Sequence, residues 1–140
     1  QVNPAGEHIF ASPESDILKL YYPLRHLNDF TLDQAQFYWR CMHGPKVRQR
    51  ALSAAILRYI QVHRLEDPLG QGLGEVRGVE EEPFTGHAEL WFEHKALIDA
   101  IASPAGQEAF GLFFEDEKNF IDFKRSALWL TKEHVIFDNM

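Results

Sequence analysis

The stretch Leu57–Leu65, LRYIQVHRL, decides how this chain is expected to fold. Side chains alternate across a β-strand, so Ile60 and Val62 share an aliphatic face. The opposite face carries three polar side chains, Tyr59, Gln61 and His63. A half-buried strand usually turns one apolar face to the core and one ordinary polar face to water. A phenol, an amide and an imidazole are not typical of the solvent-exposed positions of a strand, so we expect them to line a semi-polar cavity.

A second stretch, Gly86–Glu93, repeats this arrangement. Its aliphatic side holds Ala88, Leu90 and Phe92, and its other side holds His87, Glu89 and Trp91. Two strands of this kind predict a sheet with helices on the aliphatic side. We expect the cavity on the opposite side of the sheet, where the two polar sets would meet.

Other patterns supply the remaining elements. Residues 16–25 read as a strand, and Thr31 with Gln34 fits a capping box at a helix start. Gly44-Pro45 is expected to interrupt that helix before a second segment that runs to about residue 55. Further patterns predict helices at 95–101 and from 103 to about 123, then a strand at 128–137.

The order strand, helix, strand, strand, helix, strand predicts an α+β, ferredoxin-like βαββαβ fold with an antiparallel four-stranded sheet. One face of such a sheet lacks helices and is commonly covered by a second copy of the chain. We therefore expect a homodimer.

Composition narrows the class of protein. A chain of 140 residues, 45% hydrophobic and 25% charged, fits one globular domain, expected at 16–140 after a flexible arm at 1–15. The net charge of −7 argues against binding to nucleic acid or an anionic membrane surface. Cys41 is the single cysteine, and neither a transmembrane run nor a signal peptide is recognisable, so we expect a cytoplasmic protein.

Residues 67–83 are expected to form a long loop. Gly70, Gly72 and Gly74 resemble a nucleotide-binding loop, but the run Glu80-Glu81-Glu82 would repel phosphate, so we reject that interpretation. The loop is either a flap over the cavity mouth or a surface segment without a functional role.

Five motifs in order carry a resemblance to a known family. They are WxxxHGP at Trp39–Pro45, RYIQVH at Arg58–His63, FTGHAELW at Phe84–Trp91, DExxFID at Asp116–Asp122 and the segment Ser126–Val135. From about residue 16 to 137 the chain resembles the EthD family of the dimeric α+β barrel superfamily. The resemblance implies a ferredoxin-like protomer whose sheet pairs with a second copy to form a barrel.

The resemblance implies a range of functions. The superfamily includes cofactor-free lyases, isomerases, polyketide cyclases and monooxygenases, and also haem enzymes, and similar fungal proteins act as dehydratases or decarboxylases on aromatic polyketides. Fold does not decide among these. The family pattern leads us to expect an acidic residue near Gly86, as in a DGxAE run, where this sequence has Thr85-Gly86-His87.

Ten residues are candidates for a site. The expected catalytic residues are His63, His43, His87, Glu89 and Tyr59, and the expected substrate-binding residues are Trp39, Trp91, Gln61, Tyr21 and Phe113. Imidazole titrates near neutral pH and so suits proton transfer. His43 is either such a group or a helix cap. Tyr59 and His63 lie about 13 Å apart along one strand, so they would act at different ends of a substrate or form a polar layer in a dimer interface.

Two acidic residues also have alternative interpretations. Glu89 would raise the basicity of His87, or the pair is exposed on an edge strand. Glu117 lies in a phenylalanine stripe, where burial would raise its pKa and make it a proton donor. We favour the alternative, a carboxylate neutralised by an arginine such as Arg58. No metal-ligand spacing is recognisable, so we expect neither metal nor cofactor.

The main hypothesis is a cofactor-independent acid–base enzyme of the lyase or dehydratase, isomerase or cyclase type. It would act on a hydrophobic, oxygenated small molecule such as an aromatic or polyketide-like compound. The alternatives are a cofactor-free monooxygenase on the same scaffold and a non-catalytic accessory dimer that binds small molecules.

Overall fold

The computed structural model describes residues 16–140, and the arm predicted at residues 1–15 lies outside this range. Four strands form one antiparallel sheet in the order β2-β3-β1-β4. They are β1 (Ile17–Leu24), β2 (Arg58–His63), β3 (Gly86–Glu93) and β4 (Trp129–Thr131). The helical elements are α1 (Leu32–Phe37), the π-helical η2 (Tyr38–His43), α2 (Gly44–Gln49), α3 (Pro68–Val76), α4 (His94–Ala102), α5 (Pro104–Glu117) and the short 3₁₀ helix η3 (Phe123–Arg125).

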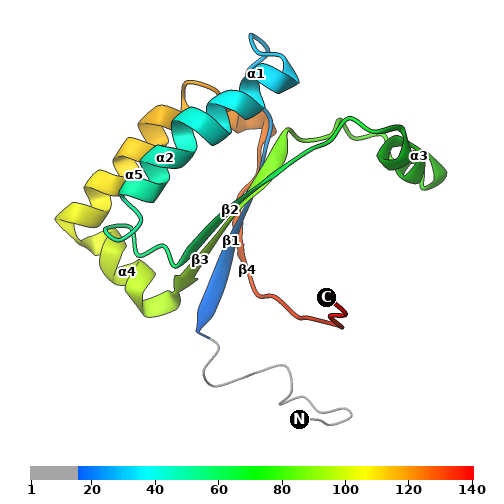
Figure 1. Ribbon diagram of the computed structural model, residues 1–140. Helices are drawn as coiled ribbons and strands as arrows, with labels where there is room; N and C mark the ends of the chain where they lie inside the picture. The colour runs from blue at the N-terminus through cyan, green and yellow to red at the C-terminus, as the bar shows by residue number, and fades with distance from the viewer. Residues whose placement is uncertain (1–15) are drawn as a thin grey trace.

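Helices cover one face of the sheet, and Figure 1 shows α1, α2, α4 and α5 on that side. We call the opposite side the outer face. This element order and topology confirm the predicted ferredoxin-like α+β fold. Within residues 16–140 no helix combines the length and apolar character needed to cross a bilayer.

Strand register shows that the predicted pairing of faces is wrong. Tyr59 lies opposite Leu90 and Gln61 opposite Ala88. Residues directly opposite in an antiparallel pair share a face. The polar side of β2 therefore shares the helix-covered face with the apolar side of β3. Val62, by contrast, lies opposite His87 on the outer face.

The contacts of Trp39 explain why β2 turns its polar side inward. Its indole is fully buried and stacks on the His63 ring, with 4.4 Å between ring centroids. Its backbone carbonyl accepts a hydrogen bond from Gln61 Nε2 at 2.8 Å. Alternation along a strand shows which side chains share a face, but these contacts with η2 decide which face is buried.

The capping box at Thr31 and Gln34 is confirmed, since both reciprocal hydrogen bonds form. The predicted helix break at Gly44-Pro45 is wrong. Gly44 keeps right-handed helical angles, and its N–H donates to the carbonyl of Trp39, five residues earlier. The wider π-helical spacing accommodates Pro45, which has no N–H to donate, and the chain continues directly into α2.

The predicted loop at 67–83 is also wrong in part, because residues 68–76 form α3. The Asp67 side chain accepts from the N–H of Leu69, and Pro68 occupies the first turn, so a cap and a favoured proline offset the three glycines. At the other end of the chain, α5 ends at Glu117 and β4 has 3 residues, so both are shorter than predicted.

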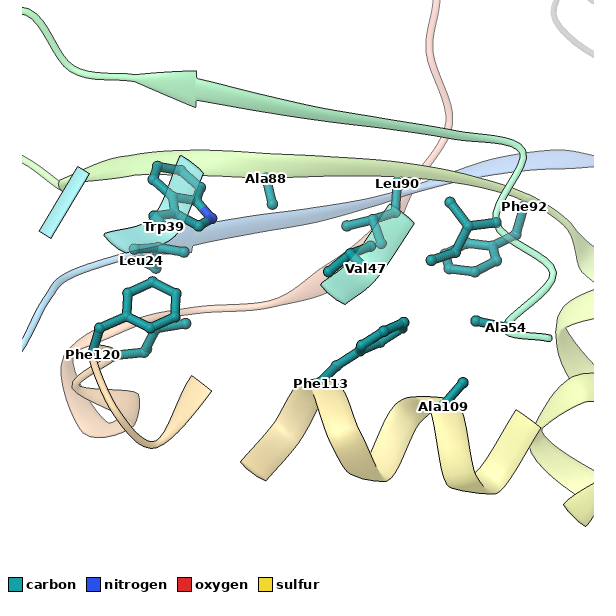
Figure 2. Packing of buried hydrophobic residues seen from close by; sticks show 12 residues of the cluster. Leu24, Trp39, Val47, Ala54, Ala88, Leu90, Phe92, Ala109, Phe113 and Phe120 are labelled. Atoms are coloured by element: carbon teal, nitrogen blue, oxygen red, sulfur yellow. The ribbon is translucent and has the colours of Figure 1, made fainter. Parts of the chain in front are cut away.

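The core lies between the helices and the sheet. Figure 2 shows Phe113 and Ala109 directed from α5 toward the strands, with Val47 of α2 beside them. Trp39 and Phe92 are among the largest fully buried side chains.

Gly86 is a position where any larger side chain would disturb this packing. A Cβ atom there would lie 2.1 Å from the carbonyl oxygen of Val62 and 2.9 Å from the Trp39 ring. We expect Gly86→Ala to lower the free energy of unfolding by about 1–3 kcal/mol, measured by urea titration. Gly70→Ala in α3 is the matched control, because nothing lies within 4 Å of its added methyl group. Equal stability of the two variants would contradict the prediction.

Candidate active site

A cavity of about 300 Å³ lies between the helices and the sheet. Most of its lining is aromatic or aliphatic. Its ionisable lining residues are Tyr22, His43, Tyr59 and Glu117, and the neighbouring walls include Trp39, Phe110, Phe113 and Phe114. An apolar pocket with a few convergent polar groups is the usual form of a small-molecule site.

His43 comes from η2 and is 5% exposed. Its Nδ1 lies 2.7 Å from Oδ2 of Asp116, at the end of α5. The carboxylate can only accept, so Nδ1 carries the hydrogen and Nε2 keeps its lone pair. Burial lowers the pKa of His43, although the Asp116 carboxylate opposes this. At neutral pH the ring is therefore an uncharged base. Its Nε2 makes no hydrogen bond to a residue between 16 and 140.

Asp116 is held by several donors at once. Its Oδ1 accepts from Tyr38 Oη at 2.7 Å and from Lys46 Nζ at 2.7 Å, and Asn119 also donates to it. Burial alone would raise the pKa of this carboxyl, but the hydrogen bonds from Lys46, Tyr38 and His43 lower it to about 2. Asp116 is thus a fixed anion that orients His43.

Glu117 is the next residue of α5 and points to the cavity side. Its Oε1 accepts from the hydroxyl of Tyr22 on β1 at 2.9 Å. Burial raises the pKa of Glu117 to about 7, with a smaller contribution from the Asp116 charge. Burial also raises the pKa of Tyr22, which stays a neutral phenol. Glu117 can consequently give or take a proton near neutral pH.

Tyr59, Gln61 and His63 form a hydrogen-bonded row along β2. Gln61 Nε2 donates to the Trp39 carbonyl and to Tyr59 Oη, so its Oε1 must accept from His63 Nε2 at 2.8 Å. Burial raises the pKa of Tyr59 to about 12. The Tyr59 oxygen accepts from Gln61, and its own hydrogen has no acceptor within residues 16–140, so it is available to a ligand.

The structure separates His63 from the cavity. The imidazole lies beyond the Trp39 indole, on a groove along the edge of β2. Burial lowers the pKa of His63, and the Arg40 charge lowers it further. His63 and His43 therefore lie on two different hollows, whereas the sequence placed them together.

The outer face carries a different cluster. His87 Nε2 lies 2.8 Å from Glu89, and Lys19 pairs with both Glu89 and Glu133. The Tyr21 ring packs on His87, with 4.7 Å between centroids. Trp91 lies under Lys19 and Arg58. The expectation that these side chains share a cavity with Tyr59 is wrong, because they lie on the opposite side of the sheet.

Comparison with known proteins identifies the family. A model of the EthD domain matches residues 28–124, more than half of the chain. The chain belongs to the EthD family. No curated protein sequence matches it.

Two solved structures share the fold of this EthD protein. An EthD family protein from Bacillus halodurans C-125 superposes with a TM-score of 0.56 at 15% identity, covering 84% of this chain and 99% of that one. A dimeric protein of unknown function with a ferredoxin-like fold, from Bacteroides fragilis NCTC 9343, gives 0.53 at 8% identity, covering 85% of this chain and 98% of that one. Identities this low show the fold alone.

In this EthD protein the cavity contains four of the ten predicted residues, His43, Tyr59, Trp39 and Phe113. Sequence reasoning missed Tyr22 and the role of Asp116, although the DExxFID motif contains Asp116.

The expectation that an arginine neutralises Glu117 is wrong, since Arg58 stacks on Trp91 and Tyr22 is the observed partner. The capping role considered for His43 is wrong because the helix continues past it. In residues 16–140 no three His, Cys, Asp or Glu side chains gather as metal ligands would.

Proposed function

We propose that this protein is a cofactor-independent acid–base enzyme of the lyase, isomerase or cyclase type, with the helix–sheet cavity as its active site. One observation carries the proposal. Two proton-transfer groups with different protonation preferences, the neutral His43 ring and Glu117 with a pKa of about 7, line a single apolar cavity. Paired groups whose environments separate their protonation states are a common basis for acid and base roles.

A dehydration illustrates the roles. His43 Nε2 takes a proton from a carbon next to a carbonyl, and Tyr59 donates a hydrogen bond to the carbonyl oxygen as it gains negative charge. Protonated Glu117 gives its proton to a hydroxyl on the adjacent carbon, which leaves as water while the double bond forms. Solvent then removes the proton from His43 and returns one to Glu117. Isomerisation and ring closure use the same proton abstraction.

The cavity suggests the size and character of the substrate. Its volume of about 300 Å³ is roughly twice that of the ~150 Å³ apolar cavity that holds benzene in an engineered protein core. A bicyclic aromatic ketone is therefore an appropriate size. The phenylalanine walls favour a flat apolar body, and Tyr59 and His43 favour an oxygenated edge.

We further propose that two copies pair through the outer face. Support comes from the Bacteroides fragilis protein, which is described as dimeric, and from the half-exposed Trp129 on this face. A dimer closed in this way would be the α+β barrel expected from the family. The cavity of each copy would stay on the far side of its own sheet.

Deuterium exchange tests the acid–base proposal without knowledge of the natural substrate. In D₂O we expect the protein to accelerate the exchange of hydrogen for deuterium at the carbon next to the carbonyl of α-tetralone, as monitored by NMR. The variant His43→Ala should slow this exchange about a hundredfold. The exposed His94→Ala is the control and should exchange at the wild-type rate. Native mass spectrometry on the same samples reports the dimer and bound ligand.

The alternatives give different results. Binding of the ketone without exchange would overturn the acid–base proposal and indicate an accessory binding dimer. Loss of exchange in His87→Ala, with His43→Ala unaffected, would place the chemistry on the outer face instead.

A further inference from the structure

A second hollow runs along the free edge of β2, between this strand and η2 with α2. Its volume is about 860 Å³. We call it the β2 groove. Its lining includes Arg40, Arg48, Arg58, Tyr59, Gln61 and His63. Within residues 16–140, no aspartate or glutamate lines this groove.

This charge distribution is unusual for the chain. The protein has 14 Lys and Arg against 21 Asp and Glu. Arg25, Arg64 and Arg125 pair with carboxylates, whereas Arg40 and Arg48 form no ion pair with a described Asp or Glu. Arg58 borders the groove, but its guanidinium lies over the Trp91 ring on the outer face, 4.7 Å from the ring centroid, so Arg40 and Arg48 are the groove arginines that matter here. Guanidinium groups suit planar carboxylates and phosphates, which they bind with two hydrogen bonds at once.

The β2 groove adjoins the cavity. Val47 and Tyr59 line both hollows. Trp39 belongs to the cavity wall, and its other side stacks on His63 in the groove. A single layer of side chains therefore separates the apolar cavity from a basic surface, and Tyr59 forms part of the boundary.

We propose that the β2 groove binds an organic anion, with its carboxylate or phosphate at Arg40 and Arg48 and its apolar body on the groove's own apolar lining, Val47, Ala51 and Ile56. The ligand class is an amphipathic anion, with a flat hydrophobic body and one anionic group. This anion site does not depend on the proposed function, because the groove is separate from the cavity. The anion site itself stands on the groove and its arginines.

The β2 groove also gives His63 a place in binding. Its Nε2 is committed to Gln61, which leaves Nδ1 as an acceptor when the ring is neutral. A neutral ring offers an anion no donor at Nδ1, so His63 would contact the anion favourably only when protonated, which burial and the Arg40 charge oppose and a bound anion would favour. Among residues 16–140, the charged groups that line the groove around His63 are arginines, so an anionic ligand would meet no described carboxylate there.

Calorimetry with three matched probes tests the proposal: 2-naphthoate, 2-naphthyl phosphate and the neutral 2-naphthalenemethanol. We expect at least one anion to bind at least tenfold more tightly than the alcohol, with an affinity that falls as salt rises. The double variant Arg40→Ser with Arg48→Ser should lose this preference. The two arginines are exposed, so the fold should persist. Arg50→Ser is the control, since Arg50 is exposed on the same segment but lies outside the groove.

The two anions distinguish a carboxylate site from a phosphate site. Equal affinity for the alcohol and both anions would overturn the groove proposal, and so would an anion preference that survives the double variant. Tetralone exchange by the wild type in either case would leave the proposed function standing. If the double variant loses the anion preference, the groove proposal is supported. If the wild type also fails to exchange tetralone, that result counts against the proposed reaction.

Discussion

Glu117→Gln is expected to remove the pH dependence of stability that arises at this site. The folded protein holds the Glu117 proton up to a pKa of about 7, against an ordinary value of 4.5. Between these values the folded state binds a proton that the unfolded chain has released. The contribution of Glu117 to the free energy of unfolding therefore falls as pH rises from 4.5 to about 7, and is constant above.

Glutamine has no proton to lose, so the variant lacks this decline. The difference in unfolding free energy, variant minus wild type, should increase by up to about 3 kcal/mol between pH 4 and pH 8, measured by urea titration. Tyr22 can still donate to the glutamine oxygen, so packing should be retained. Glu115→Gln, on the exposed side of the same helix, is the control and should not reproduce this increase. Parallel pH curves for wild type and Glu117→Gln would mean that Glu117 titrates as an ordinary surface carboxyl.

Asp116→Ala should be among the most destabilising single changes in the helix layer. It removes the acceptor shared by His43, Tyr38 and Lys46. The buried His43 N–H is then left without a partner, while Lys46 is half exposed and regains water. We expect a loss of about 2–4 kcal/mol in unfolding free energy by urea titration at pH 7.

Asp116→Asn separates the loss of charge from the loss of volume. The amide keeps the shape but puts an NH₂ group among donors, so the hydrogen of His43 should move to the other ring nitrogen. NMR of the histidine ring nitrogens would detect this change of tautomer. An unchanged His43 tautomer together with wild-type stability would show that Asp116 does not orient the ring.

The sequence predicted the fold well because the order of strand and helix patterns limits the topology strongly. The sequence did not predict which face of β2 turns toward the helices, and the reason is physical. Alternation in β2 groups Tyr59 with His63, but the stacking of Trp39 on His63 decides that this group turns toward the helices. That contact joins residues 24 positions apart, and no local pattern contains it. Only four of the ten predicted site residues consequently line the cavity.

The parts of the site that were missed depend on distant partners. Tyr22 and Glu117 are 95 residues apart in the chain, and His43 and Asp116 are 73 apart. The phenylalanine stripe around Glu117 offered a raised pKa as one interpretation, but we favoured neutralisation by an arginine, because the sequence could not show that Tyr22 would be the partner. For α3, the signal was present in Asp67-Pro68, and the glycines that follow were given too much weight.

The π-helical η2 makes the shape of the cavity depend on the number of residues in this helix. Its hydrogen bond from Gly44 to Trp39 spans one residue more than an α-helical bond would. Deleting a single residue here would restore α-helical spacing and turn the following helix by about 100°. Val47 would then leave the cavity wall, and Lys46 would lose its contact with Asp116. Neither change requires that a side chain lining the cavity be replaced. Related chains can thus acquire different pockets through one insertion or deletion, which a comparison of residue identities alone would overlook.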